Sequence, residues 1–360
     1  QSISTSNQLA YAFGDNARAF YATESAPNAT DISWEKIYTN NIGLDLSMFN
    51  GRLNASLDGY IRDTKDMIMQ SQALPASYGA NPPKANSADL RTYGFEFSIS
   101  WNDHFKLGGE EFYYGVNFGL GDSQSFITKY DNPTCNLSSP YVGQRLGDIW
   151  GFRTDGLFAT DLEAANWEVD QTIVNNMINT EVVDTGLHAG DLKYRDLDGN
   201  KVLERTLSAN DPKDTEVIGN SLPRYNYNAG INLSWYGVDL SIMFQGIGHQ
   251  DCYPGTEAHL FWGPYSRPYS TFIPSDFMSN VWSEENPDAY FPRPRGYVAL
   301  FDNRDLGAIK DRYLQNVAYF RLKNLTLGYS LPSHLLKKAK ISKIRFYFSG
   351  ENLLTISPLK

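Results

Sequence analysis

Apolar and polar residues alternate strictly between Tyr225 and Trp235. The odd positions are apolar or aromatic, and the even positions between them are Asn, Gly or Ser. After Tyr236-Gly237 the alternation resumes, with apolar residues at the even positions from Val238 to Phe244. Because successive side chains of a strand point to opposite faces, this pattern predicts a long hairpin with one apolar and one polar face. A strand of about 11 residues matches the length that crosses a bilayer when tilted.

The same pattern predicts six more strands, and the connections between strands are as informative as the strands. Short turns alternate without exception with three long loops, at about 63–90, 121–223 and 246–317. This is the layout of an outer-membrane barrel, whose short turns lie at one end and long loops at the other. A secreted β-sandwich that binds a ligand is the alternative. Three long loops are unusual in such a fold, because a soluble β-sandwich has mostly short connections. The eight predicted strands lie at about 37–48, 53–61, 92–101, 112–120, 225–235, 238–244, 319–331 and 344–350.

The two faces of these strands have different predicted surroundings. We expect the apolar face to contact outer-membrane lipid, with Tyr225 and Trp235 at the aromatic girdles. We expect a bulge near Lys323-Asn324, where the apolar phase switches from even to odd positions. The polar face should line the barrel lumen, with Asp45, Asp58, Glu96, Asn117, Asn228, Asn232, Asp239 and Gln245.

Composition excludes some classes of protein. The net charge of −10 argues against a nucleic-acid partner. No apolar run approaches the roughly 18 residues of a membrane helix, which excludes an α-helical membrane protein and leaves a barrel open. Cys135 and Cys252 fall in predicted loops, and either a disulfide between them or two free thiols is compatible with the sequence.

Several short strings, in order along the chain, resemble the C-terminal barrel region of SusC-like TonB-dependent outer-membrane transporters. The strings are Trp34-Glu35 with 41–45 (NIGLD), 94–96 (GFE) with Trp101, 190–200 (GDLKYRDLDGN) with 218–220 and Pro223, 311–314 (DRYL), 321–329 (RLKNLTLGY) with Pro332, and 350–355 (GENLLT).

This resemblance implies an all-β fold, with residues 1–360 as the C-terminal portion of a large antiparallel transmembrane barrel of about 22 strands. Its long loops would be extracellular and its short turns periplasmic, and the plug domain would lie outside this chain. The implied function is TonB-dependent import of a nutrient oligomer across the cell outer membrane of a Gram-negative bacterium, together with a SusD-like lipoprotein. The implied cargo is a glycan first and an oligopeptide next.

The long loops are rich in aromatic rings, which stack on sugar faces and also anchor protein interfaces. We expect His259, Phe261, Trp262, Tyr265 and Trp150 to bind substrate or a partner. The alternative for each ring is internal packing of a folded loop.

One loop also suggests a metal site. Asp196, Asp198, Asn200 and Glu204 offer oxygen ligands at the spacing of a calcium loop. The loop departs from the EF-hand pattern at Lys201, which replaces the turn Gly, and at Leu207, which replaces the final Glu. We therefore expect either a Ca²⁺ ion in the 196–204 loop or a turn rich in Asp, Asn and Gly that needs no metal.

The sequence gives little support for catalysis. The five His residues are scattered, and the chain has no Gly-x-Ser-x-Gly elbow, His-Glu-x-x-His or phosphate loop. We predict that the protein is not an enzyme. An outer-membrane barrel protease or lipase is the alternative, and it would need a nucleophile beside a base on the loops.

Overall fold

The computed structural model describes residues 32–70, 82–175, 186–267, 273–301, 304–337 and 340–359. Near the N-terminus it describes the backbone of four short strands that form two pairs. These are β1 (Ile3–Ser6) with β4 (Tyr21–Glu24), and β2 (Ala12–Phe13) with β3 (Ala17–Arg18).

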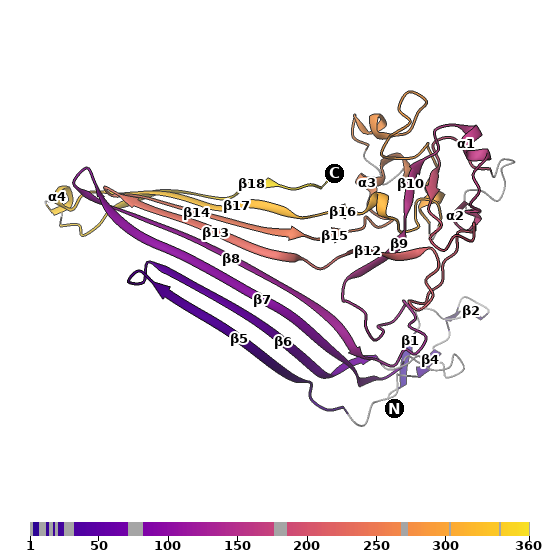
Figure 1. Ribbon diagram of the computed structural model, residues 1–360, viewed down its shortest axis with the longest axis horizontal. Coiled ribbons are helices and arrows are strands. Elements are labelled where there is room, and N and C mark those ends of the chain that lie inside the picture. Colours follow the sequence, from indigo (N-terminus) through magenta and orange to yellow (C-terminus); the bar gives the residue numbers. More distant parts are fainter. Residues whose placement is uncertain are drawn as a thin grey trace.

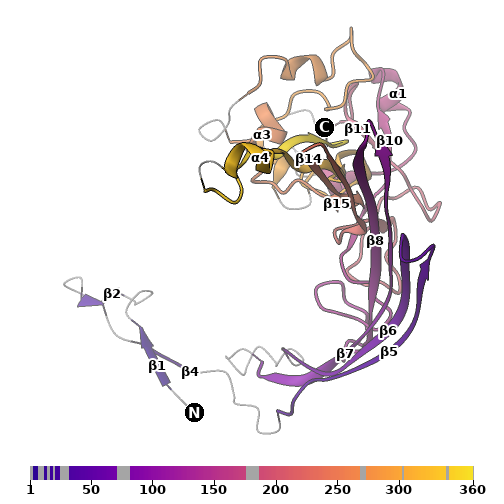
Figure 2. The same ribbon diagram turned by 90° about the vertical axis from the view of Figure 1, so that its left-hand side faces the viewer.

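Eight long strands form one antiparallel sheet in which each strand pairs with its neighbour in sequence. The sheet is curved like a section of a cylinder wall (Figures 1 and 2). This arrangement confirms the predicted eight-strand meander. The strands are β5 (Lys36–Met48), β6 (Leu53–Gln70), β7 (Lys84–Leu107), β8 (Glu110–Lys129), β13 (Arg224–Trp235), β14 (Val238–His249), β17 (Tyr319–Ser330) and β18 (Arg345–Ile356).

The short connections lie at one end of the sheet and the long loops at the other (Figure 1). In the turn between β13 and β14, Tyr236 and Gly237 have φ of 51° and 84°. Positive φ at both central residues gives a turn whose twist matches that of the flanking strands. The connection between β17 and β18 is longer and contains α4 (Ser333–Leu336).

The register sorts side chains onto two faces across all eight strands. Because residues that pair across strands share a face, one row can be followed through the whole sheet. The polar residues predicted to share a face do so. One polar row is Asp45, Ser56, Ser98, Gly119, Asn228, Gln245, Arg321 and Thr355, and the adjacent apolar row is Leu46, Ala55, Ile99, Phe118, Ala229, Phe244, Leu322 and Leu354.

The predicted bulge in β17 is confirmed, because the register with β18 shifts between Leu322 and Asn324. Several strands are longer than predicted. β6 continues to Gln70 and β7 begins at Lys84, so much of the predicted loop 63–90 is strand, and β18 continues to Ile356. The extensions of β6 and β7 carry an Arg91–Asp63 ion pair with a 2.7 Å Nε–Oδ1 distance. The extensions mix charged and apolar residues without the period of two that predicts the other strands.

The two longest loops pack together into one unit, which we call the loop body (described residues 130–175, 186–223, 250–267, 273–301 and 304–318). Its hydrophobic core contains residues from both loops. Among the described residues, no helix is long and apolar enough to cross a bilayer. The elements of the loop body are β9 (Asp148–Phe152), β10 (Thr154–Leu157), α1 (Asp161–Ala165), α2 (Thr172–Asn175), β11 (Leu192–Tyr194), β12 (Thr215–Asn220), β15 (Asp251–Cys252), α3 (His259–Trp262), η2 (Gly263–Tyr265), η4 (Phe277–Asn280), η5 (Tyr297–Leu300), η6 (Asp311–Tyr313) and β16 (Gln315–Asn316).

Candidate functional site

The centre of the loop body is a cluster of aromatic rings. Trp262 and Tyr265 are each 1% exposed, and Tyr313 is fully buried. The Trp262 and Tyr313 ring centroids are 5.2 Å apart, and Phe261 packs edge-on to Trp262 at 4.9 Å. The polar atoms of the two predicted binding rings have internal partners. Trp262 Nε1 donates to the Gly255 carbonyl at 3.0 Å, and Tyr265 Oη donates to the Pro292 carbonyl at 2.6 Å.

This packing changes the interpretation of the predicted binding rings. Trp262 and Tyr265 offer no face to a ligand in this conformation, since both are core residues that hold the loops together. Phe261 is partly buried against the same core. Trp150 lies on β9 opposite Val217 and is half-buried. A direct role for these side chains in binding stays a prediction, and Phe261, Trp150 and His259 are the members of this set that keep some exposure.

His259 lies between a hydroxyl and a carboxylate. Its Nδ1 is 2.5 Å from Ser266 Oγ, and its Nε2 is 3.2 Å from Glu257 Oε2. A serine, a histidine and a carboxylate are the groups of a hydrolase triad. Ser266 is only 2% exposed, however, so its hydroxyl has no room to attack a substrate carbonyl. We interpret the contact as one that fixes the turn after α3.

A buried ammonium group lies where the two loops meet. The ammonium of Lys310, which is fully buried, donates to the carbonyls of Asp305 at 2.6 Å and Leu306 at 3.2 Å. It also lies 5.3 Å from the Tyr313 ring centroid, at cation–π distance. Burial lowers the pKa of Lys310 to about 7 and raises the pKa of the Asp305 carboxyl. From the other loop, Tyr194 Oη donates to the Asp305 carbonyl at 2.7 Å.

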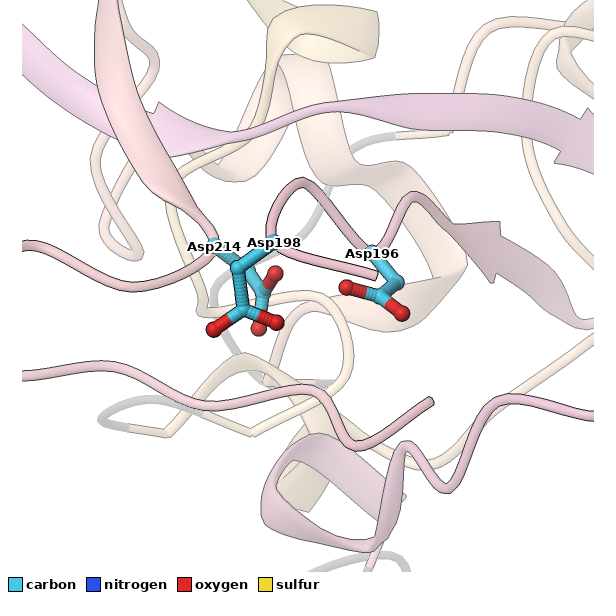
Figure 3. Close-up of side chains that lie close together, drawn as sticks. All are labelled: Asp196, Asp198 and Asp214. Carbon is cyan, nitrogen blue, oxygen red and sulfur yellow. The ribbon is translucent and has the colours of Figure 1, made fainter. Parts of the chain in front are cut away.

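The predicted metal loop brings three carboxylates together (Figure 3). Oxygens of Asp196, Asp198 and Asp214 lie within 4.8 Å of one another. Backbone N–H groups already donate to them. Asp196 accepts from Gly199 and Lys201, and Asp214 accepts from Leu197 and Glu204, each at 2.7 Å.

The electrostatics of these carboxylates differ. Burial raises the pKa of Asp214. Burial also acts to raise the pKa of Asp196, but N–H donation from Lys201 and Gly199, together with hydrogen bonds to Asp214 and Asp198, leaves that pKa below its usual value.

Asn200 and Glu204, the other two predicted ligands, lie beside the three carboxylates. The Asn200 amide nitrogen contacts both Asp198 and Glu204 at 3.2 Å, while its Oδ1 accepts from the Val202 N–H. Asp214 was not predicted, because it follows the loop by ten positions and the local spacing gives no signal for it. A calcium ion in this loop stays a prediction, with Asp214 now a fifth candidate ligand.

Comparison with known proteins identifies the family. A family model described as "TonB dependent receptor-like, beta-barrel" matches residues 2–353. The chain belongs to this family. TonB-dependent receptors are outer-membrane proteins of Gram-negative bacteria, which places the chain in the cell outer membrane.

Individual relatives agree with the family. The TonB-dependent receptor P3 of Formosa agariphila is 25% identical over 340 residues, which are 91% of this chain and 30% of that receptor. The TonB-dependent receptor SusC of Bacteroides thetaiotaomicron is 34% identical over 122 residues, or 33% of this chain and 11% of SusC. These relatives are named as receptors and not as enzymes. The chain spans about 30% of the length of P3.

Solved structures confirm the fold. A structure described as the RagAB peptide importer in the open-open state matches 99% of this chain and 34% of its own, with a TM-score of 0.67 and 20% identity. The closed-closed state gives a TM-score of 0.65. At this level of identity the match describes the fold of the TonB-dependent receptor barrel and not its cargo.

The barrel fold also accounts for the aromatic side chains at the two ends of β13. Trp235 lies at the end of β13, is 39% exposed, and donates from Nε1 to the Leu107 carbonyl at 3.1 Å. An amphipathic ring in this position fits the interfacial girdle of a membrane barrel. At the opposite end, Tyr225 is 46% exposed and has a φ of 56°. Both ends of β13 therefore carry exposed aromatic rings, and their place in the girdles stays a prediction.

The two cysteines are separate in the structure. Cys135 is partly exposed and Cys252 is exposed, and both are free thiols. Of the two alternatives that the sequence leaves open, the structure has the unbonded one.

Proposed function

We propose that the chain forms part of the barrel wall and the extracellular loops of a TonB-dependent transporter that imports a nutrient oligomer. The observation that carries the proposal is the separation of polar and apolar rows across eight adjacent strands. A wall between lipid and an aqueous or plugged lumen requires two such faces. The family match and the relatives named as TonB-dependent receptors support it.

In this proposal the two faces and the loop body have different tasks. The polar face, which includes Asn228, Asn232 and Gln245, lines the lumen. The loop body forms part of the outer entrance, where a SusD-like lipoprotein rests on it. TonB acts from the periplasm through the receptor's plug domain. Import consists of binding, closure of the lipoprotein and displacement of the plug, and no covalent bond of the cargo is broken.

Glycans and oligopeptides are the two cargo classes to test. The many rings in the loops favour glycans, but burial of Trp262 and Tyr265 weakens that argument. The name of the RagAB peptide importer, which shares the fold, supports an oligopeptide. We therefore place oligopeptides beside glycans as candidate cargo.

Deletion of the gene for the full-length receptor tests the proposal. Growth on one class of oligomer should be lost, growth on its monomers should be unchanged, and a plasmid copy of the receptor should restore growth. The same loss should follow deletion of the TonB protein. A surface lipoprotein should co-purify with the receptor. Uptake of both oligomer classes that continues without the receptor would contradict the proposal.

A further inference from the structure

The connection between β17 and β18 differs in charge from the rest of the chain. From Leu331 to Gly350 the sequence has five basic residues (Lys337, Lys338, Lys340, Lys343 and Arg345) and no acidic residue, although the net charge of the chain is −10. Such a local excess of one sign indicates a partner of the opposite sign. The position of this connection in the barrel decides which partner can reach it.

Three of these lysines are available to a partner. Lys337, Lys340 and Lys343 are exposed, and within the described ranges none of them forms an ion pair with a carboxylate. Arg345 is different, because its guanidinium pairs with Asp239 at 2.5 Å. Lys338 lies outside the described residues. The connection therefore presents three exposed ammonium groups beyond the ends of β17 and β18, of which the one on Lys343 also interacts electrostatically with Asp239.

Apolar side chains are exposed beside these lysines. Leu336 is 5% exposed, whereas Leu335 is 59% and Ile341 is 43% exposed. The Ile341 N–H donates to the Leu336 carbonyl at 3.3 Å, so the backbone folds back on itself there. The apolar exposure continues onto β18 at Phe346, which is 63% exposed. Exposed apolar and basic side chains are thus next to each other at the edge of the apolar face.

The other three turns at this end lack the feature. Arg52, in the first turn, pairs with Asp103 at 2.9 Å. The second turn, at Gly108-Gly109, is followed by two acids, Glu110 and Glu111, and the third is the uncharged Tyr236-Gly237. The basic surface is therefore specific to the connection between β17 and β18 (left end in Figure 1).

We propose that this connection binds anionic phospholipid headgroups of the periplasmic leaflet of the outer membrane. Lys337, Lys340 and Lys343 contact the phosphates, and Leu335 and Ile341 enter the boundary with the acyl chains. The charges are complementary, and the surface is continuous with the lipid-facing apolar rows of β17 and β18. An apolar anchor combined with a basic cluster is the pair of signals that gives stable contact with a membrane surface. This site holds lipid and is independent of the cargo, so it goes beyond the proposed function.

The test uses the full-length receptor in lipid nanodiscs that contain phosphatidylcholine and phosphatidylglycerol. Native mass spectrometry after release measures how many molecules of each lipid stay bound. We expect the wild type to retain phosphatidylglycerol preferentially. The triple variant K337Q/K340Q/K343Q should lose that preference by about fivefold per lysine removed.

Two matched variants separate this site from general charge effects. The control K129Q/K201Q/K213Q removes the same charge at the loop end and should keep the preference. K337R/K340R/K343R keeps the charge and should also keep it. Equal phosphatidylglycerol retention by the wild type and the triple glutamine variant would overturn the proposal. It would also be overturned if the triple variant kept its lipid preference but lost a co-purifying periplasmic polymer or protein.

Discussion

Arg295 and Asp191 form an ion pair between two loops, although they are 104 positions apart in sequence. Their side chains are 14% and 3% exposed. Such a pair is worth little when solvated, but breaking it inside a protein leaves a charge without solvent or partner. The pair therefore joins the 121–223 and 246–317 loops into the loop body.

Arg295→Met should destabilise the loop body by about 3–5 kcal/mol, because it leaves Asp191 buried and unpaired. Hydrogen exchange of residues 186–220 should speed up while exchange in β13 and β14 stays slow. The control Arg195→Ala removes a pair with Asp155 whose side chains are 52% and 37% exposed. It should cost no more than about 1 kcal/mol. Similar exchange in both variants would contradict the role of the buried pair.

Trp262→Ala should open a cavity in the loop body and cost about 3–5 kcal/mol. Tyr297 is 42% exposed in the same loop, and Tyr297→Ala should be close to neutral for stability. Limited proteolysis of the loops in the folded receptor measures both effects. If Trp262→Ala left the loops resistant to protease and weakened only cargo binding, the ring would be a binding residue and not a core residue.

Stability of the loop body should rise with pH above neutrality because of Lys310. Its folded pKa, about 7, is below its ordinary value of 10.5. Between these values the unfolded chain binds a proton that the folded chain does not, so stability increases with pH by up to about 1.4 kcal/mol per unit. Urea-dependent proteolysis at pH 7, 8 and 9 should show this slope in the wild type. Lys310→Met should remove it, and equal slopes in the two proteins would mean that Lys310 stays charged.

Gly94 and Gly59 provide a matched pair of positions that tests close packing in the barrel wall. A Cβ on Gly94 would lie 2.4 Å from the ring of Tyr60, its partner across the strands, whereas a Cβ on Gly59 would meet nothing within 4 Å. Gly94→Ala should therefore displace the Tyr60 ring and destabilise the wall by about 1–3 kcal/mol, and Gly59→Ala should not. The temperature at which the folded barrel converts to its unfolded form, read from the mobility shift in gel electrophoresis, measures this difference in stability. An equal shift in both would contradict the close contact.

The 196–204 loop gives a prediction about metal. If it binds calcium, a concentration of 100 times the dissociation constant should stabilise the loop body by about 2.7 kcal/mol. Asp196→Asn and Asp214→Asn should abolish the gain, while Asp155→Asn, outside the loop, should retain it. Terbium luminescence and protease resistance with and without a chelator measure this. If calcium had no effect on the wild type, the 196–204 loop would be a turn that its own backbone N–H groups stabilise without a metal.

The wall could be predicted from sequence because lipid on one side and polar surroundings on the other impose a period of two. The prediction was accurate from Tyr227 to Trp235, and it located the bulge at Lys323. It stopped short at Ile61, although β6 continues to Gln70. The extensions of β6 and β7 carry ion pairs such as Asp63–Arg91 beside buried residues such as Ala88, and this mixture leaves no periodic signal.

The loop body could not be predicted in the same way. Composition reveals that rings are abundant, but whether Trp262 is buried depends on contacts with Tyr313 and Phe291 that lie far along the chain. The acidic loop was identified from local spacing, and Asp214 was missed because the chain returns to that loop only through its tertiary fold. Long-range pairs such as Arg295 and Asp191 likewise leave no local pattern.

The most direct test of the barrel wall is spin labelling along β13 in the full-length receptor, with Cys135 and Cys252 replaced by Ser. Single cysteines at positions 228 to 233 would each carry a nitroxide, and accessibility to oxygen and to a water-soluble nickel complex would be compared. We predict high oxygen accessibility at Ala229, Ile231 and Leu233, and low values at Asn228, Gly230 and Asn232. The opposite phase, or the absence of a period of two, would contradict the assignment of these faces to lipid and lumen.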